Sequence, residues 1–402
     1  MKILVICQHY YPEQFRITDI CEELVKCGHQ VTVLTGLPNY PMGYIYPGYK
    51  DKSKRHEIIN GVDVHRTFTI GRRRGIVFRV LNYYSFMLSS CRRVNKLDDD
   101  FDVVFVNQLS PVMMAEAAVK YKKKHGAKLV VYTLDLWPES LTVGGIKKGS
   151  LPYRYYHGVS KKIYKSADKI FVTSREFKEY FSCEFDINDC EYLPQYSETI
   201  FDPKSCKKEP DGNIDLMFAG NVGIAQSVDT IIRAAALTKD IENLCWHIVG
   251  DGSELDKCKQ LAKTMEVDNV IFHGRRSLEE MPQYYAMADA MLVTLYKNDV
   301  ISKTLPGKVQ TYMAAGKPII GSIDGEAAQI IRESKCGLCG PAEDAEALAE
   351  NVRLFIQKDA SLYGESAVEY SNNHFGKAGF MDTLDNCFSV FCPSKSKNEA
   401  LK

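Results

Sequence analysis

The stretch "IDLMFAGNVGIAQSVDTIIRAAAL", residues 214–237, contains a short, mostly apolar run, a turn with two glycines and an amphipathic segment. The run Asp215–Ala219 has the length of a buried strand, and Val228–Leu237 has apolar residues at helical spacing. Gly220 and Gly223 lie between them and allow a ligand to approach the backbone closely. A strand, a glycine turn and a helix in this order predict a doubly wound α/β domain.

The same alternation of apolar runs and amphipathic segments extends in both directions from this stretch. In the second half we expect strands at Trp246–Val249, Val270–His273, Ala290–Leu295 and Pro318–Gly321. In the first half we expect strands at Ile3–Ile6, Val31–Leu34, Val103–Val106, Lys128–Thr133 and Lys169–Thr173. Short apolar strands separated by helices favour parallel sheets covered on both faces.

A chain of 402 residues is long enough for two such domains. The stretch 188–213 is rich in Pro, Asp, Lys and Ser, which is typical of a linker. We therefore expect a first Rossmann-like domain at 1–195, a linker at 196–212 and a second Rossmann-like domain at 213–375. A C-terminal helix at about 376–390 is expected to cross back to the first domain, and 393–402 to be disordered. Ligands of such sheets bind at the carboxyl ends of the strands, and two facing domains would form a deep cleft.

The composition indicates in which cellular compartment the protein works and whether it has a metal site. No apolar run approaches the ~20 residues of a membrane span, and the first residues are too polar for a signal peptide, so we expect a cytoplasmic protein. Thirteen cysteines, an odd number, suit a reducing compartment. The motif Cys336–Cys339 has no second CxxC to complete a zinc site, so we interpret it as loop cysteines. Asp98-Asp99-Asp100 is interpreted as a solvated loop, and no metal site is expected.

Charge is unevenly distributed although the net charge is zero. Residues 1–195 hold 29 Lys and Arg against 21 Asp and Glu, and residues 196–402 hold 22 against 30. Within the first half, residues 72–93 combine arginines with apolar and aromatic residues. A basic amphipathic helix of this kind can lie on an anionic membrane surface, or it can pack on the sheet with solvated arginines. A nucleic-acid interface is disfavoured because no groove-reading module accompanies the arginines.

A second stretch, "LPGKVQTYMAAGKPIIG" at 305–321, contains a lysine in an unusual place. Pro306-Gly307 predicts a turn and Val309–Ala315 a short helix. Lys308 then lies in a first helical turn, where the helix dipole disfavours a cation. Free backbone N–H groups together with a lysine would suit a bound phosphate. The alternative is an ordinary exposed lysine.

Several motifs in order resemble bacterial glycosyltransferases of family 4, which have the two-domain GT-B fold. Within that family the chain looks most similar to putative L-fucosamine (N-acetyl-L-fucosaminyl) transferases of O-antigen and capsule clusters. The motifs are "YYPE" (10–13), "GHQVTVLTGLPNYPMG" (28–43), "LDLWPES" (134–140), "FAGNVGIAQ" (218–226), "VGDGSEL" (249–255), "VIFHGRR" (270–276) and "LPGKVQTYMAAGKP" (305–318).

The resemblance implies that the second domain holds a UDP-sugar and the first domain holds the acceptor. Lys308, Asp135 and Glu139 are the expected catalytic residues. The expected donor-binding residues are Gly220, Asn221, Gly223, Gln226, Gly250, Arg275, Arg276, Pro306, Gly307, Thr311 and Glu326. The expected acceptor-binding residues are Glu13, Arg16, Asn39, Tyr40 and Gly43. Each has a structural alternative: a tight turn, surface arginines, a helix-capping glutamate or a rigid loop.

The chain also departs from the family pattern. Lys303 and Thr311 stand where typical members have two glutamates, and Asn221 and Gln226 stand where they have an arginine and a lysine. Leu134 replaces a histidine, and residues 9–12 replace a Gly-Gly loop. We expect Lys308, helped by Arg275 or Arg276, to replace the missing cations at the diphosphate.

The resemblance implies a retaining glycosyltransferase, and Lys308 at the helix start would make it metal-independent and without a cofactor. It would transfer N-acetyl-L-fucosamine or another N-acetylated 6-deoxyhexosamine from a UDP-sugar to a polyprenyl-diphosphate-linked glycan in O-antigen or capsule synthesis. It would work at the inner face of the plasma membrane, bound peripherally through residues 72–93. The alternatives are a UDP-sugar 2-epimerase of the same fold and a non-catalytic subunit that binds a nucleotide sugar.

Overall fold

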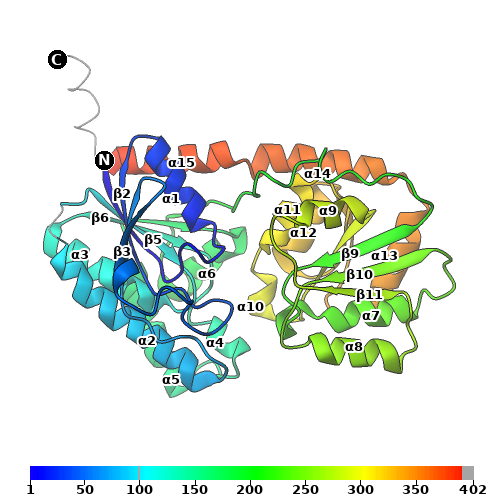
Figure 1. Ribbon diagram of the computed structural model, residues 1–402, viewed down its shortest axis with the longest axis horizontal. Coiled ribbons are helices and arrows are strands. Elements are labelled where there is room, and N and C mark those ends of the chain that lie inside the picture. The colour runs from blue at the N-terminus through cyan, green and yellow to red at the C-terminus, as the bar shows by residue number, and fades with distance from the viewer. Residues whose placement is uncertain (98–99, 392–402) are drawn as a thin grey trace, which may run out of the picture. The chain divides into compact units, whose positions relative to one another are not determined.

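The computed structural model describes residues 1–97 and 100–391. They form two compact units. The first contains 1–97, 100–173, 177–193 and 381–391, and the second contains 174–176 and 194–380. Each unit has one sheet with helices packed on it (Figure 1). Asp98, Asp99 and the expected tail at 393–402 lie outside the described residues.

The first unit is built on an eight-stranded sheet of order β3-β4-β2-β1-β5-β6-β7-β8. All neighbouring strands are parallel except the antiparallel pair β3–β4. The central strand β1 is buried on both faces, because Ile3, Leu4, Val5 and Ile6 are all fully buried. The strands are β1 (Lys2–Ile6), β2 (Gln30–Thr35), β3 (His56–Ile59), β4 (Val62–Arg66), β5 (Val103–Gln108), β6 (Lys128–Thr133), β7 (Lys169–Val172) and β8 (Cys190–Tyr192).

Helices connect these strands. The longest, α2, extends from Ile76 to Arg93 and begins after Gly75, which has φ 100°. The other helices are α1 (Ile17–Lys26), α3 (Glu116–His125), α4 (Ser140–Val143), α5 (Leu151–Tyr164) and α6 (Arg175–Phe185), with single 3₁₀ turns η1 (Ser53–Arg55), η2 (Val94–Lys96) and η3 (Val112–Ala115). None of the helices in the described part of the chain is both long and apolar enough to cross a membrane.

The second unit is built on a six-stranded parallel sheet of order β11-β10-β9-β12-β13-β14. Its strands are β9 (Ile214–Ala219), β10 (Leu244–Val249), β11 (Val270–Gly274), β12 (Ala290–Thr294), β13 (Ile319–Ser322) and β14 (Gly337–Gly340). Its helical elements are η4 (Ile224–Gln226), α7 (Val228–Ala236), α8 (Leu255–Thr264), α9 (Met281–Met287), α10 (Asp299–Ser302), α11 (Gly307–Ala314), α12 (Gly325–Glu333), α13 (Ala345–Ile356), α14 (Ala360–His374) and α15 (Lys377–Phe391), whose last residues belong to the first unit.

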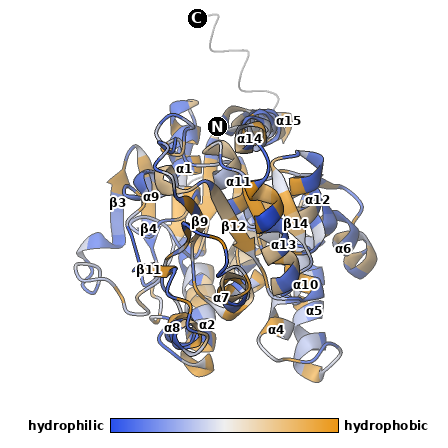
Figure 2. Cartoon of the chain, turned by 90° about the vertical axis from the view of Figure 1, so that its right-hand side faces the viewer, coloured by the Kyte–Doolittle hydropathy of each residue, from blue (hydrophilic) through white to orange (hydrophobic). Residues whose placement is uncertain are grey.

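Strand β9 shows how this sheet is buried. Leu216 and Phe218 belong to one apolar cluster, and Met217 and Ala219 belong to another. Successive side chains of a strand point to opposite faces, so the two clusters lie on the two sides of the sheet. In Figure 2, β9 and β12 are largely orange, whereas the helices around them mix hydrophobic and hydrophilic residues. The continuous apolar run in the sequence therefore marks a strand covered on both faces.

Some sequence expectations need correction. Cys339 is part of the edge strand β14 and its sulfur bonds the Ile323 carbonyl, so the CxxC motif is not simply a loop. The hairpin β3–β4 was not expected. The stretch 196–212 contains no regular element, but it packs on the second unit, where Phe201 and Cys206 are buried in the core. It is therefore not a free spacer.

Candidate functional site

Two glycines shape the carboxyl end of the second sheet. Gly220 follows β9 with φ 148°, and Gly250 follows β10 with φ 146°. A Cβ atom on Gly250 would lie 1.8 Å from the Gly220 carbonyl oxygen, and one on Gly252 would lie 2.3 Å from the Val222 carbonyl oxygen. Glycine is required at Gly250 and Gly252 because any side chain there would collide with the neighbouring backbone. The two loops are thereby held against each other at the end where ligands of such sheets bind.

Lys308 extends from the start of α11 to the same place. Its Nζ atom lies 3.8 Å from the centroid of the Phe218 ring, and a Cβ atom on Gly220 would lie 3.1 Å from it. The residue is half-buried, but the nitrogen itself is out of solvent and finds no hydrogen-bond partner among the described residues. Burial lowers the pKa of this amine to about 7. The ring face attracts a cation, but it does not replace hydrogen bonds.

The surroundings of Lys308 suit an anion. Pro306 is the N-cap of α11 and has extended backbone angles, so the helix starts at Gly307. The first N–H groups of a helix have no partner within the helix, and its N-terminus carries partial positive charge. An anion bound here would meet these N–H groups and would favour the charged form of the buried amine.

Asn221 and Gln226 lie together in the loop after β9. The Asn221 amide donates to Gln226 Oε1 at 3.1 Å, and both groups crowd Gly223, where a Cβ atom would lie 2.6 Å from Asn221 Nδ2. Asn221 is exposed, so a ligand can reach it. The backbone of Gln226 is fixed because its carbonyl accepts the Thr294 hydroxyl at 2.6 Å.

Thr311 and the arginine pair, which we expect to bind the donor, make contacts within the second unit. Thr311 is buried, and its hydroxyl donates to the Gly307 carbonyl one turn earlier at 3.1 Å, so it serves its own helix. Arg275 and Arg276 are both exposed after β11. Arg276 lies over the Tyr284 ring and 3.9 Å from Glu280, which fits a surface role.

Glu326 is buried in the first turn of α12, where it holds another segment of the second unit. One carboxylate oxygen accepts from the Ser174 hydroxyl and, at 3.3 Å, from the Glu176 backbone N–H. The other oxygen is buried without a hydrogen-bond partner in the described chain. Burial raises the pKa of this carboxyl. The paired oxygen favours the structural alternative for Glu326, and the unpaired oxygen leaves its predicted contact with the donor untested.

In the first unit, Glu13 is the hub of a network at the carboxyl end of β1. Its carboxylate accepts from the backbone N–H of Asn39 at 2.8 Å and of Tyr40 at 2.5 Å. The ring of His9 lies 3.0 Å from its other oxygen and is stacked on Phe15. Glu13 is thus engaged in holding the loop after β2. His9 is not among the predicted acceptor-binding residues, although it lies four residues before Glu13 and contacts it.

The loop after β2 is also fixed to the loop after β4. Asn39 is fully buried and accepts from the Arg72 backbone N–H at 3.0 Å. Gly43 has φ 78°, and a Cβ atom there would lie 3.0 Å from the Arg72 carbonyl oxygen. Tyr40 keeps 41% of its surface exposed, and Arg16 is the N-cap residue of α1. Among the expected acceptor residues, Tyr40 is the one best placed to touch a ligand.

The two expected catalytic carboxylates of the first unit have different environments. Asp135 follows β6 and accepts from the Ser110 backbone N–H at 3.0 Å; burial raises its pKa, and Arg72 opposes this shift. Glu139 is buried and already engaged, because Tyr153 donates to it at 2.6 Å and Lys148 lies 3.2 Å away. Asp135 therefore remains a candidate for chemistry, and Glu139 is better explained by structure.

Comparisons with known proteins agree with this architecture. Residues 14–189 match the family model "Glycosyl transferase 4-like domain", and residues 202–374 match "Glycosyl transferases group 1". The chain is 30% identical over 258 residues to probable glycosyltransferase WbjE of Pseudomonas aeruginosa, covering 60% of this chain and 62% of that protein. It is 25% identical over 405 residues to the putative colanic acid biosynthesis glycosyl transferase WcaI of Escherichia coli, covering 92% of this chain and 97% of that protein.

Solved structures show the same fold at lower identity. Sucrose-phosphate synthase from Thermosynechococcus elongatus superposes with a TM-score of 0.76 at 16% identity, covering 98% of this chain and all of that one. Anabaena HepE superposes with a TM-score of 0.71 at 15% identity, covering 97% of this chain and all of that one. With one glycosyltransferase domain matched in each half, the chain belongs to the glycosyltransferases of the GT-B fold.

Proposed function

We propose that this protein transfers a sugar from a UDP-sugar to a lipid-linked glycan during the synthesis of a surface polysaccharide. The sugar we favour is N-acetyl-L-fucosamine or another N-acetylated 6-deoxyhexosamine, as the sequence resemblance implies. The observation that carries the proposal is the buried Lys308 amine, which lacks a hydrogen-bond partner in the described chain and lies beside the glycine turn at the end of β9.

The names of similar proteins support the substrate classes. The HepE structures contain UDP or UDP-glucose, which supports a UDP-sugar donor. WcaI is named for colanic acid biosynthesis, and the structural neighbours WaaB and WaaG are named for lipopolysaccharide synthesis. These names favour an acceptor that is part of a growing surface glycan.

The geometry suggests how the second unit would assist the reaction. When the bond between the sugar carbon C1 and the diphosphate breaks, negative charge grows on the phosphate oxygens. The start of α11 and the Lys308 amine would stabilise that charge, because preorganised donors act strongly in a water-poor site. In this proposal Lys308 takes the role that a divalent cation has in other enzymes, so no metal or cofactor is needed.

A retaining reaction needs no protein nucleophile in this scheme. The acceptor oxygen forms its bond to C1 on the face that the diphosphate leaves, and a phosphate oxygen takes the acceptor proton. Asp135 would orient a hydroxyl, since its half-buried carboxylate already accepts from the Ser110 N–H and keeps further lone pairs.

The membrane part of the proposal rests on α2. Ile76 and Val77 are each 65% exposed at its start, and Arg74 and Arg79 beside them are also exposed. Exposed apolar residues flanked by arginines suit the surface of an anionic bilayer. We propose that residues 72–93 bring the enzyme to the inner face of the plasma membrane, where a polyprenyl-linked acceptor would lie.

The test is UDP release from a panel of UDP-sugars, with and without lipid extract and with EDTA. Wild type is compared with Lys308→Ala and with Lys257→Ala, a control at an exposed lysine of the same unit. We expect acceptor-dependent release that falls about a hundredfold in Lys308→Ala only. Release that is insensitive to Lys308→Ala would refute the site. UDP binding without release would indicate a non-catalytic subunit, and deuterium incorporation at C2 without acceptor would indicate an epimerase.

A further inference from the structure

The first unit contains a large pocket that the proposed reaction does not use. It is an open pocket of about 820 Å³ between α2, the chain that follows β4, and the turn η1 before β3. This volume lies in the range of small-molecule sites, about 300–1,000 Å³. The pocket therefore needs an explanation of its own.

One side of the pocket is apolar and is formed by a single stripe of α2. Leu81, Tyr84 and Leu88 line it at spacings of three and four residues, which places them on one face of the helix. Phe68 faces them from the chain after β4. Leu81, Leu88 and Phe68 are 43%, 48% and 56% exposed, so they offer apolar surface that the fold itself leaves uncovered.

The other side of the pocket is strongly basic. Arg55, Arg66, Arg92, Arg93 and Lys96 all line it, and no acidic side chain among the described residues does. Arg66 is buried and paired with Glu57, although its Nε atom finds no partner in the described chain. Arg55, Arg92 and Lys96 make no ion pair with a described residue, so their charge is available to a ligand.

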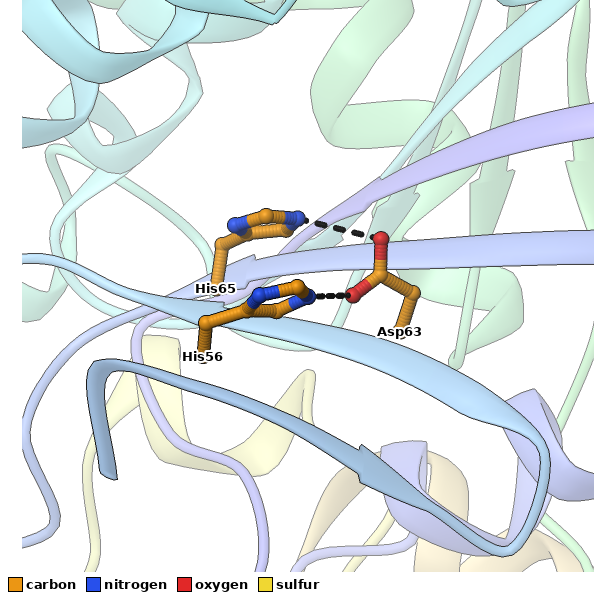
Figure 3. Close-up of side chains that lie close together, drawn as sticks. All are labelled: His56, Asp63 and His65. Carbon is orange, nitrogen blue, oxygen red and sulfur yellow. Dashed lines mark hydrogen bonds and ion pairs between the residues drawn. The ribbon is translucent and has the colours of Figure 1, made fainter. Parts of the chain in front are cut away.

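A cluster of His56, Asp63 and His65 holds Arg93 in this basic wall. Figure 3 shows both imidazole rings directed at the carboxylate of Asp63. The Nε2 atoms of His56 and His65 lie 2.6 and 3.0 Å from its two oxygens, and the Arg93 guanidinium donates to His65 Nδ1 at 2.9 Å.

This cluster has the composition of a metal site, but its hydrogen bonds argue against one. Arginine can only donate, so His65 Nδ1 accepts and its Nε2 atom carries the hydrogen that Asp63 accepts. A metal on that Nε2 atom would have to displace the hydrogen and end the bond from Arg93. The cluster is better explained as a chain of hydrogen bonds that positions a cationic wall.

We propose that this pocket binds one anionic lipid molecule. The phosphate of the headgroup would lie between Arg92, Lys96 and Arg55, since guanidinium groups match phosphate oxygens in geometry and charge. The first part of the hydrocarbon chain would lie along Leu81, Leu88 and Phe68. An apolar side and a basic side, with no acidic group among the described lining residues, fit an amphiphile of this kind better than a sugar or a free nucleotide.

The position of the pocket supports a lipid source. The apolar stripe continues beyond it to Val77, which is 65% exposed one helical turn before Leu81. A lipid in the pocket would therefore lie next to the surface that we propose contacts the membrane. The inference rests on that part of the proposed function and not on sugar transfer.

The experiment measures binding of a short-chain lipid that stays monomeric, so that a membrane surface plays no part. Full-length protein without donor sugar is titrated with dihexanoyl phosphatidic acid, dihexanoyl phosphatidylcholine and inorganic phosphate in a calorimeter. The variants are Arg92→Gln with Lys96→Gln, Leu88→Gln, and the control Lys123→Gln with Lys124→Gln, which removes the same charge from an exposed part of α3. UDP binding by each variant checks that the chain is folded.

We expect one phosphatidic acid per chain and binding of the other two compounds at least about tenfold weaker. The pocket pair and Leu88→Gln should each weaken binding about tenfold or more, and the control pair less than about twofold. Equal losses in the control pair, equal binding of inorganic phosphate or of phosphatidylcholine, or no binding would each overturn the lipid site. Because no transfer is measured, failure here leaves the glycosyltransferase proposal standing, and the reverse also holds.

Discussion

The carboxyl ends of β9 and β1 both contain buried polar groups, but their partners differ. At the end of β1, Glu13 accepts two backbone N–H groups and contacts His9, so the chain itself supplies the hydrogen-bond partners of this carboxylate. At the end of β9, the Lys308 amine is buried and finds no hydrogen-bond partner among residues 1–97 and 100–391. Buried polar groups are normally paired, so the first arrangement indicates architecture and the second indicates a missing ligand.

The glycine contact beside Lys308 should give the largest effect when it is changed. Gly250→Ala would place a Cβ atom 1.8 Å from the Gly220 carbonyl oxygen. We expect the free energy of unfolding to fall by about 4 kcal/mol or more, with loss of UDP binding. The control is Gly212→Ala, because Gly212 has φ 84° but a Cβ atom built on it would have no neighbour within 4 Å. Its free energy of unfolding should fall by only about 1–2 kcal/mol. Equal losses in urea unfolding would show that backbone angle, and not crowding, requires Gly250.

A change of Glu13, in the network at the end of β1, should lower the stability of the protein. Glu13→Gln keeps the shape but removes the charge that accepts from Asn39 and Tyr40, so we expect a loss of about 2 kcal/mol in urea unfolding. Glu179→Gln, at an exposed glutamate of the same unit, should change stability by less than about 0.5 kcal/mol. A stable Glu13→Gln protein that fails to transfer sugar would contradict the structural role and return Glu13 to the acceptor site.

The Lys308 amine should make UDP binding depend on pH. With a pKa of about 7 in the free protein, the amine is charged below pH 7 and neutral above it. An anion needs the charged form, so each binding event above pH 7 takes up a proton. We expect UDP affinity to fall up to about tenfold per pH unit between pH 7 and 9, measured by calorimetry. Lys308→Met should bind weakly with a nearly flat profile; an equally steep profile in that variant would assign the titration elsewhere.

The smallest effect is expected at Thr311. Its hydroxyl donates to the carbonyl of Gly307 within α11. Thr311→Val keeps the shape and should change UDP affinity less than about twofold, while stability changes by about 1 kcal/mol or less. A tenfold loss of UDP affinity would show that the hydroxyl reaches the ligand and would restore Thr311 to the donor site.

Much of the fold was predictable because strong local patterns repeat. The apolar runs at Ile3–Ile6 and Asp215–Ala219 became central strands of the two sheets, since runs buried on both faces are nearly continuous in sequence. The hairpin β3–β4 was missed because its residues, such as His56, Glu57 and Asp63, are polar and lie at a sheet edge. The edge strand β14, which contains Cys339, was missed because a strand of four residues has little periodicity.

The site was predictable only in part. Lys308 was found because a lysine in a first helical turn conflicts with the helix dipole. Glu326 and Glu139 were expected to bind or catalyse, yet their carboxylates hold Ser174 and Tyr153. The sequence shows that each carboxylate is present but not which residue it contacts. The partner of Glu326 is 152 residues away in the chain, and that of Glu139 is 14 residues away.

The sequence by itself determined the two-domain α/β plan, the glycine turn after β9 and the unusual position of Lys308. These follow from local rules of spacing, backbone freedom and helix electrostatics. Only the tertiary structure decided which polar side chains are already paired. It also revealed the pocket beside α2, because burial and pairing depend on contacts between segments that are distant in the chain. That is why Glu13 became part of the framework while the amine of Lys308 was left for a ligand.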